Sequence, residues 1–94
     1  MPDRPTRLPE DVEPYRTIGP FDAVTFPEGL RRTHDLKKST WGKVALAAGN
    51  LVFVWEDEQG GRAELTAPAD IVVPPQTPHH VEGDDFTVSI TFYR

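Results

Sequence analysis

Cysteine is absent from the 94 residues of this chain. The chain therefore cannot form a disulfide bond, a thiolate metal site or a thiol nucleophile. Long apolar runs are also lacking, because none approaches the roughly 18 residues that cross a membrane. The start, Met1–Arg4, does not have the composition of a signal peptide. We therefore expect a soluble, cytoplasmic protein that has no membrane partner.

Positive charge is scarce. The chain has 10 lysines and arginines against 15 aspartates and glutamates, which gives a net charge of −5 and a pI near 5.0. The basic pairs Arg31-Arg32 and Lys37-Lys38 stand apart, with acidic residues on both sides. Domains that bind nucleic acid carry a basic patch or stripe that neutralises phosphates. The sequence therefore argues against nucleic acid as a partner.

Long helices are not expected either, because ten prolines and seven glycines interrupt the chain. A hydrophobic content of 37% still argues against disorder. The length allows one hydrophobic core, so we expect residues 1–94 to form a single domain. Five prolines within residues 1–20 predict an extended N-terminal arm, and the alternating pattern of residues 21–94 predicts a β-sandwich or small β-barrel.

Short runs of alternating apolar and polar residues fill the chain after the arm. They predict an all-β antiparallel sandwich or small barrel of seven to eight short strands with no long helix. The strongest local signal is Gly49-Asn50, which predicts a two-residue hairpin turn. Exposed strand edges on so small a chain need cover, so we also expect a homodimer. The expected strands cover residues 21–26, 30–34, 41–48, 51–55, 62–66, 71–73, 79–82 and 86–93.

Candidate metal ligands gather in residues 72–82, where His79 and His80 are followed by Glu82. Imidazole and carboxylate are ligands that zinc, iron and nickel accept. Neighbouring side chains of a strand point to opposite faces, so His80 shares a face with Glu82 but not with His79. Two alternatives follow: either His79 faces a pocket, or His80 and Glu82 do. A bulge after Pro78 would instead let His79 and Glu82 converge.

Several spaced motifs stand in a recognisable order along the chain. They are Leu30–His34, Lys37, Thr40–Val44, Gly49–Leu51, Pro74–Glu82 and Ile90–Tyr93. In this combination they resemble a small bacterial cupin family, usually labelled tellurite-resistance-protein-B-like, which includes YeaR-type proteins. The resemblance extends from about Leu8 to Arg94.

The resemblance implies a double-stranded β-helix, the jelly-roll barrel of cupins, which holds a divalent metal ion such as zinc, iron or nickel inside its mouth. It implies that His79 is the histidine after the proline-containing turn and that His34 is the early-strand histidine. Glu82 or His80 would be the third ligand. The chain departs from a full site because His34 stands alone where a His-x-His pair is usual, and because Thr91 replaces an acid found in relatives.

We therefore expect a small metal-binding cupin that binds or transforms a small molecule or oxyanion, in a stress response such as tellurite resistance. A non-catalytic ligand-binding or sensor module with a degenerate metal site is the alternative, which the single early histidine favours. A structural interaction domain with a vestigial pocket is a third hypothesis. The chain has no glycine-rich cofactor loop, so methyl transfer is not expected of it.

Overall fold

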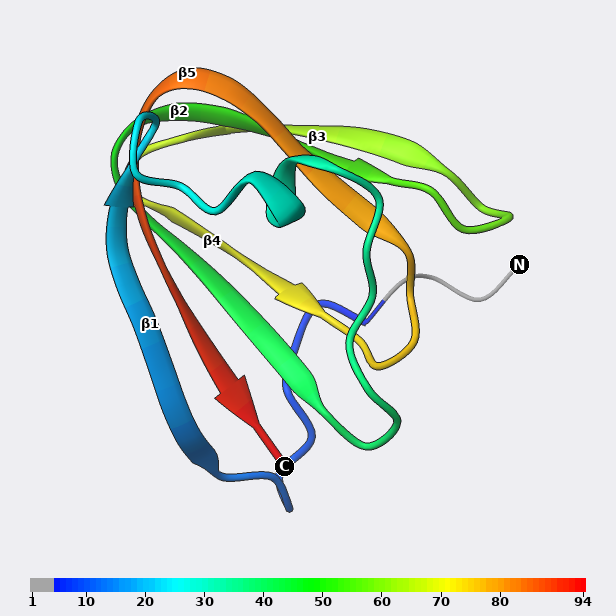
Figure 1. Cartoon of the computed structure of the whole chain (residues 1–94). Coiled ribbons are helices and arrows are strands. Elements are labelled where there is room, and N and C mark those ends of the chain that lie inside the picture. The colour runs from blue at the N-terminus through cyan, green and yellow to red at the C-terminus, as the bar shows by residue number, and fades with distance from the viewer. Residues whose placement is uncertain (1–4) are drawn as a thin grey trace.

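The computed structural model describes residues 5–94, which form an antiparallel all-β structure (Figure 1). This confirms the fold class at the level of an antiparallel all-β protein. The helical content of the described residues is one 3-10 helix of four residues, so the expectation of no long helix also holds there. The elements are β1 (Pro14–Asp22), η1 (Glu28–Arg31), β2 (Trp41–Trp55), β3 (Gly61–Thr66), β4 (Ala69–Val73) and β5 (His79–Tyr93).

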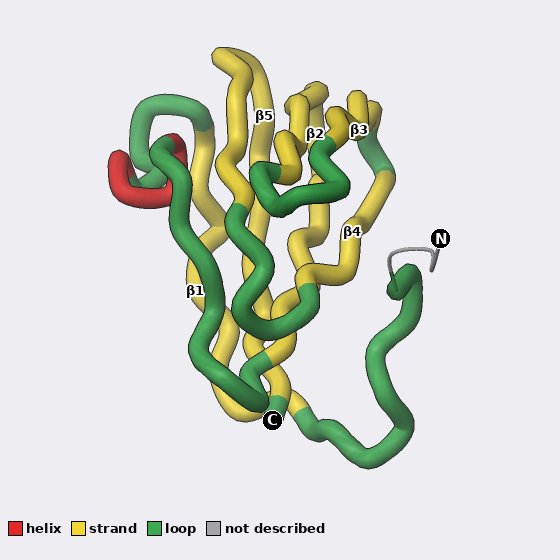
Figure 2. The backbone as a smooth tube through the Cα atoms, turned by 90° about the vertical axis from the view of Figure 1, so that its right-hand side faces the viewer, coloured by secondary structure: helices red, strands yellow, loops and turns green. Residues whose placement is uncertain are grey.

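Two long strands, β2 and β5, form the centre of the sheet and pair with each other along almost their whole length. The strand order is β1-β5-β2-β3, and β4 also pairs with β2. The first part of β2 pairs with β4 and its last part pairs with β3 (Figure 2). Within residues 5–94 no ladder joins the outer strands to each other, so the sheet is curved but not closed into a barrel.

Strand β2 changes the face that it buries halfway along. Val44 and Leu46 are buried at even positions, whereas Leu51 and Phe53 are buried at odd positions. Side chains alternate strictly along a regular strand, so one extra residue must lie between the two sets. The ladder to β5 has its register shifts in this region, on either side of Gly49.

Strand β5 makes the matching change directly opposite. Val81 is buried at an odd position and Phe86 at an even one, and between them Gly83 has a φ of 145°. Gly49, with a φ of 77°, pairs with Phe86 across the ladder. The two irregularities therefore coincide and form one shared bend, which turns both strands around the core.

The shared bend largely explains why residues 5–94 contain five strands rather than the predicted seven or eight. Gly49-Asn50 is not a hairpin turn, and Gly83–Asp85 is not a turn between strands, because Asn50 and Asp85 pair across a continuous ladder. Each apparent turn joins what the sequence presents as two strands. The predicted strand 30–34 is also wrong, since η1 occupies its first half.

The N-terminal region contributes a strand to the sheet. Most of β1 lies within residues 1–20, and β1 pairs with the C-terminal half of β5, from Asp22↔Thr87 to Pro14↔Tyr93. The boundary predicted at residue 20 therefore falls inside a strand. The part of the arm that comprises residues 1–4 lies outside the described residues.

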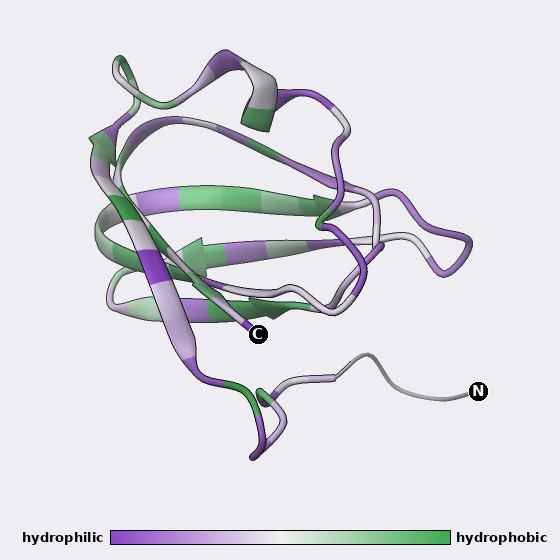
Figure 3. Ribbon diagram, turned by 60° about the horizontal axis from the view of Figure 1, so that its bottom comes forward, coloured by the Kyte–Doolittle hydropathy of each residue, from purple (hydrophilic) through white to green (hydrophobic). Residues whose placement is uncertain are grey.

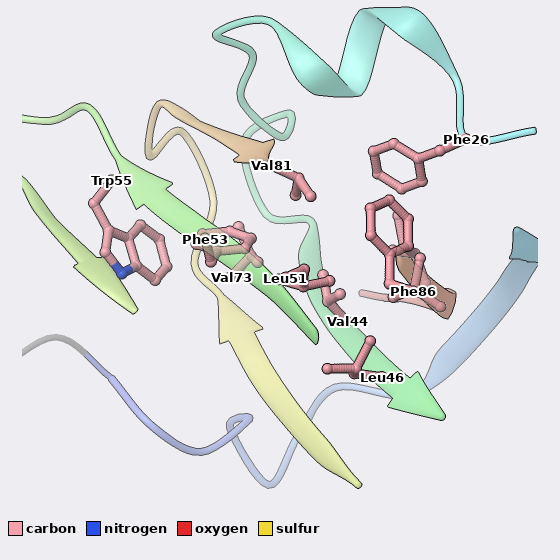
Figure 4. Close-up of a cluster of buried hydrophobic side chains, with 11 residues drawn as sticks. Phe26, Val44, Leu46, Leu51, Phe53, Trp55, Val73, Val81 and Phe86 are labelled. Atoms are coloured by element: carbon pink, nitrogen blue, oxygen red, sulfur yellow. The ribbon is translucent and has the colours of Figure 1, made fainter. Parts of the chain in front are cut away.

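The hydrophobic core lies on the concave side of the bent sheet, where aromatic rings contact one another (Figure 4). Phe26, which precedes η1, meets Phe86 edge to face with 5.3 Å between ring centroids. Figure 3 shows hydrophobic segments along the strands and a hydrophilic turn between β2 and β3. The buried core comprises Phe26, Val44, Leu46, Leu51, Phe53, Trp55, Val73, Val81, Phe86, Val88 and Ile90.

Arg31 fastens η1 to the shared bend. Its guanidinium donates to the carbonyl oxygens of Gly83, at 2.9 Å, and Ala23, at 2.7 Å. The same group lies 5.6 Å from the ring centroid of Phe26 and 5.5 Å from that of Phe86. These hydrogen bonds and aromatic contacts of the Arg31 guanidinium together hold the C-terminal end of η1 against the shared bend.

In residues 5–94 no helix has the length and hydrophobicity needed to span a membrane. Strands β1, β3 and β4 each pair along one edge only, which leaves backbone groups for a partner strand. Self-association as a homodimer stays a prediction.

Replacing Gly49 by alanine should destabilise the fold by about 2–4 kcal/mol, since a side chain at positive φ is strained and its Cβ would overlap the carbonyl oxygen of Asp85. Urea denaturation of Gly49→Ala measures this loss. Gly29→Ala is the control, because a Cβ there meets no atom within 4 Å, and its stability should change by less than about 0.5 kcal/mol. Equal stability of the two variants would contradict the shared bend.

Candidate functional site

His34 and His79 meet as an isolated β-bridge between the segment after η1 and the first residue of β5. Each backbone N–H donates to the carbonyl of the other residue, and both distances are 2.9 Å. The two rings lie on the same side of this bridge, with 4.1 Å between their centroids and planes inclined at 64°. Residues 45 positions apart in the sequence are thus in direct contact.

The Nδ1 atom of each ring is held by a backbone carbonyl two residues earlier. His79 Nδ1 lies 2.7 Å from the Thr77 oxygen, and His34 Nδ1 lies 2.9 Å from the Arg32 oxygen. A carbonyl oxygen only accepts hydrogen bonds, so each Nδ1 carries the hydrogen. The neutral form of each ring therefore has its lone pair on Nε2, which is the nitrogen available to a ligand.

Aromatic side chains of β2 surround His79. Its ring is stacked on Phe53, with centroids 4.9 Å apart and planes 18° apart, and it forms a T-shaped pair with Trp55, with 6.1 Å between centroids. His79 is only 4% exposed. Burial disfavours the charged form and lowers the pKa of His79 from 6.5 to about 4. The His79 ring is therefore neutral at neutral pH.

Both histidines line a cavity of about 50 Å³ on the concave side of the sheet, here called the inner cavity. A cavity needs roughly 10–15 Å³ to hold one water molecule, so the inner cavity has room for a few groups of that size. The two imidazoles are the polar side chains among its described lining residues, and the others are apolar or glycine. These other residues are Phe26, Leu30, Leu36, Gly42, Val44, Phe53, Val73, Val81, Ile90 and Phe92.

A second depression, here called the outer hollow, adjoins the inner cavity and shares Leu36 and Phe92 with it. The outer hollow has a volume of about 280 Å³, and its charged residues are Arg16, Lys37 and Asp35. Across the described part of the chain, neither cation has an ion-pair partner. The outer hollow thus presents two unpaired cations against one carboxylate.

His80 and Glu82 lie on the opposite face of β5, as strand alternation requires. His80 Nε2 is 2.7 Å from Glu82 Oε2, and His80 Nδ1 is 3.1 Å from Glu56 Oε2. The hydrogen bond to Glu82 is the main cause that raises the pKa of His80. The pairing with β2 is regular from His79 to Glu82, so there is no bulge that turns Glu82 toward His79.

The structure therefore brings together two of the four predicted ligands, His34 and His79, and separates them from His80 and Glu82. No three His, Asp or Glu side chains of residues 5–94 form a group that could hold a metal ion. The donors that the described chain offers at the inner cavity are two imidazoles.

The sequence alone assigns no role at the site to Glu56, Arg16 or Lys37, although Lys37 is one of the family motif residues and Arg16 lies in the expected arm. The alternating spacing of Leu51, Phe53 and Trp55 does predict the aromatic face of β2 that packs against His79.

The stability of the protein should fall as the pH decreases from about 6.5 to about 4. In this window an unfolded His79 binds a proton and the folded one does not, so proton uptake favours unfolding. At about 1.4 kcal/mol per pKa unit, the loss across the window is about 3 kcal/mol. Urea denaturation between pH 7 and pH 4 measures the slope.

His79→Gln is the comparison for this pH series, because the carboxylates and His80 titrate in both proteins and the difference isolates His79. The variant should lose less stability on acidification than the wild type. Parallel pH profiles of the two proteins would contradict a neutral, buried His79.

Comparison with known proteins identifies the family of this chain and similar folds. Residues 16–90 match the TehB-like domain family. The structure is similar to that of TehB from Haemophilus influenzae, with a TM-score of 0.80 and 28% identity over 89% of this chain and 32% of that chain. It is also similar to the structure of a protein from E. coli strain K12, with a TM-score of 0.81 and 20% identity over 94% of this chain and 95% of that chain.

A more distant likeness connects this fold with the crystal structure of FeII HppE, with a TM-score of 0.55 and 15% identity over 68% of this chain and 34% of that chain. The chain spans about a third of the length of the H. influenzae TehB. Comparison with curated proteins found no match. Because the family match extends over most of its residues, this chain belongs to the TehB-like domain family.

Proposed function

We propose that this domain binds a small molecule at a two-histidine site, in which His34 and His79 hold a divalent metal ion at the inner cavity. The observation that supports this most directly is the pair of bonds from Nδ1 to backbone carbonyls, which leaves a lone pair on Nε2 of both rings. Histidines that ligate metals have their other ring nitrogen fixed in this way.

The donor set fits zinc, nickel or iron, all of which accept imidazole nitrogen. Two protein ligands hold a metal less tightly than three, and they leave several coordination positions for water or a ligand. A bound metal would supply Lewis acidity toward an oxygen atom of the ligand. Because burial holds the pKa of His79 at about 4, protons compete weakly for this donor at neutral pH.

The residues around the two histidines orient the His79 ring and restrict what can reach the site. Phe53 fixes the plane of the His79 ring, and the apolar wall of the inner cavity excludes bulk water. The small volume restricts the ligand, or the part of it that reaches the histidines, to a few non-hydrogen atoms. The unpaired Arg16 and Lys37 in the outer hollow favour an anion, although the whole chain carries a net charge of −5.

An oxyanion fits this combination of charge and size, and the family relationship supports a role in a stress response such as tellurite resistance. We also propose that the bent sheet is the double-stranded β-helix of a cupin. The two long central strands and their shared bend support this, since they wrap one sheet around a core on its concave side.

A second function is a non-catalytic ligand-binding or sensor module in which the histidines act without a metal. The observation that favours it is the number of donors, because residues 5–94 add no third ligand to the pair. Anion binding that is equal in the presence and absence of a chelator would select this function over the first.

Zinc and nickel titrations by calorimetry, with untagged protein, test the metal site. We expect one ion per chain, and a loss of affinity of at least roughly tenfold in His34→Ala and in His79→Ala. His80→Ala is the comparison, because His80 is the neighbouring histidine on the opposite face, and its loss of affinity should be smaller than that of either other variant. Wild-type affinity in His79→Ala, or an equal loss in His80→Ala, would rule out the two-histidine site.

Tellurite and phosphate titrations test the outer hollow. Removing one exposed cation, in Arg16→Ala or Lys37→Ala, should weaken binding on the order of two- to fivefold, and added salt should reduce the difference. Lys38→Ala changes the net charge equally but lies outside the outer hollow, so it should bind like the wild type. If all three variants lose affinity equally, overall charge rather than the hollow attracts the anion.

A further inference from the structure

We propose that Glu56 is a positioning residue that fastens the segment carrying His34 to the start of β5 and so keeps the two imidazoles together. This inference rests on the proposed function of the His34–His79 pair. It concerns a different cluster on the outer face of the sheet, formed by Thr33, Glu56 and His80.

The segment from residue 32 to residue 40 needs such a fastening. It runs from η1 across to the start of β2 without forming a strand of its own (Figure 1). Its backbone bonds to the region around β5 are the His34–His79 bridge and one bond from Gln76 N to the Leu36 oxygen, at 2.9 Å. Segments with few backbone hydrogen bonds open more readily than the strands of a ladder.

Alternation at the bridge divides its side chains between two faces. His34 and His79 line the inner cavity, whereas their neighbours Thr33 and His80 contact Glu56. The Thr33 hydroxyl donates to Glu56 Oε2, and His80 Nδ1 lies 3.1 Å from the same oxygen. One carboxylate oxygen therefore bonds the immediate neighbours of both imidazoles.

Glu56 is itself well placed for this role. It directly follows the Trp55↔His79 pair at the end of β2, and its backbone N–H donates to the Pro78 oxygen at 2.8 Å. Glu56 is thus bonded through its backbone to the residue just before β5, while its side chain reaches the His34 segment.

The cluster extends further across the sheet. His80 bonds Glu82 at 2.7 Å, and Glu82 lies 3.3 Å from Arg62 on β3. These contacts orient the His80 ring, so that its Nδ1 faces Glu56. An isolated surface ion pair contributes little to stability, so we assign Glu56 a role in local geometry rather than in global folding.

Amide hydrogen exchange of the metal-free protein tests this directly, because the N–H groups of His34 and His79 are bonded to each other's carbonyls. In Glu56→Ala we expect both amides to exchange at least roughly tenfold faster, while amides of the central β2–β5 ladder keep their rates. Glu56→Gln retains an acceptor oxygen and should restore slow exchange. Glu58→Ala, an acid of the same turn, should behave like the wild type.

Zinc titration of the same variants provides the second readout, and we expect roughly tenfold weaker binding in Glu56→Ala and near-normal binding in Glu56→Gln. Thr33→Val removes one of the two contacts of the Glu56 carboxylate, so it should also accelerate exchange at His34. This variant provides the test if Glu56→Ala does not fold. Unchanged exchange at His34 and His79 in Glu56→Ala and Thr33→Val, or faster exchange throughout the ladder, would overturn the inference. Faster exchange limited to the bridge, in a protein whose wild type binds no metal, would support the positioning role while rejecting the proposed metal site.

Discussion

The antiparallel pairing of β2 with β5 is the interaction on which the other features of this structure depend. Each strand has 15 residues, and both change their buried face at one shared bend. Before the bend β2 offers an edge to β4, and after it an edge to β3, so the same strand serves two parts of a curved sheet. The bend also creates the concave side where the core and the inner cavity lie. The site therefore depends on the centre of the sheet, although one of its two histidines comes from a segment outside any strand.

The sequence predicted the all-β class and most of the strand positions, because alternation of apolar residues reports directly on half-buried strands. The predicted ends of strands at Gly49 and Gly83 are wrong for one physical reason. A glycine with positive φ serves equally well in a tight turn and in a bulge inside a continuous strand, and only the partner opposite decides between them. That partner lies more than 30 residues away in the sequence. The predicted strand over residues 30–34 is wrong for a different reason. Arg31 makes contacts with Ala23 and Gly83 that no local sequence pattern predicts.

The site was predictable in part. Strand alternation correctly separated His79 from His80 and Glu82, and the family resemblance pointed to His34 as the second histidine. No local rule could decide which face of β5 is interior, because the irregularity at Gly83 reverses the alternation between the two halves of the strand. The carbonyl groups that fix the rings, from Arg32 and Thr77, belong to the backbone, so the residue types at these positions do not reveal them. Glu56 was equally hidden, since an acid in a turn is ordinarily exposed to solvent.

The single bridge between His34 and His79 limits which insertions and deletions the sequences of this family can tolerate. Two residues, Arg32 and Thr33, separate the end of η1 from His34, and Arg31 anchors that end to the bend. An insertion or deletion of one residue in this short link would exchange inner and outer side chains, so that a neighbour would replace His34 at the cavity. Length changes in the turn around residues 37–40 carry no such penalty. Relatives that keep the histidine pair should therefore preserve the length of the link more strictly than its composition.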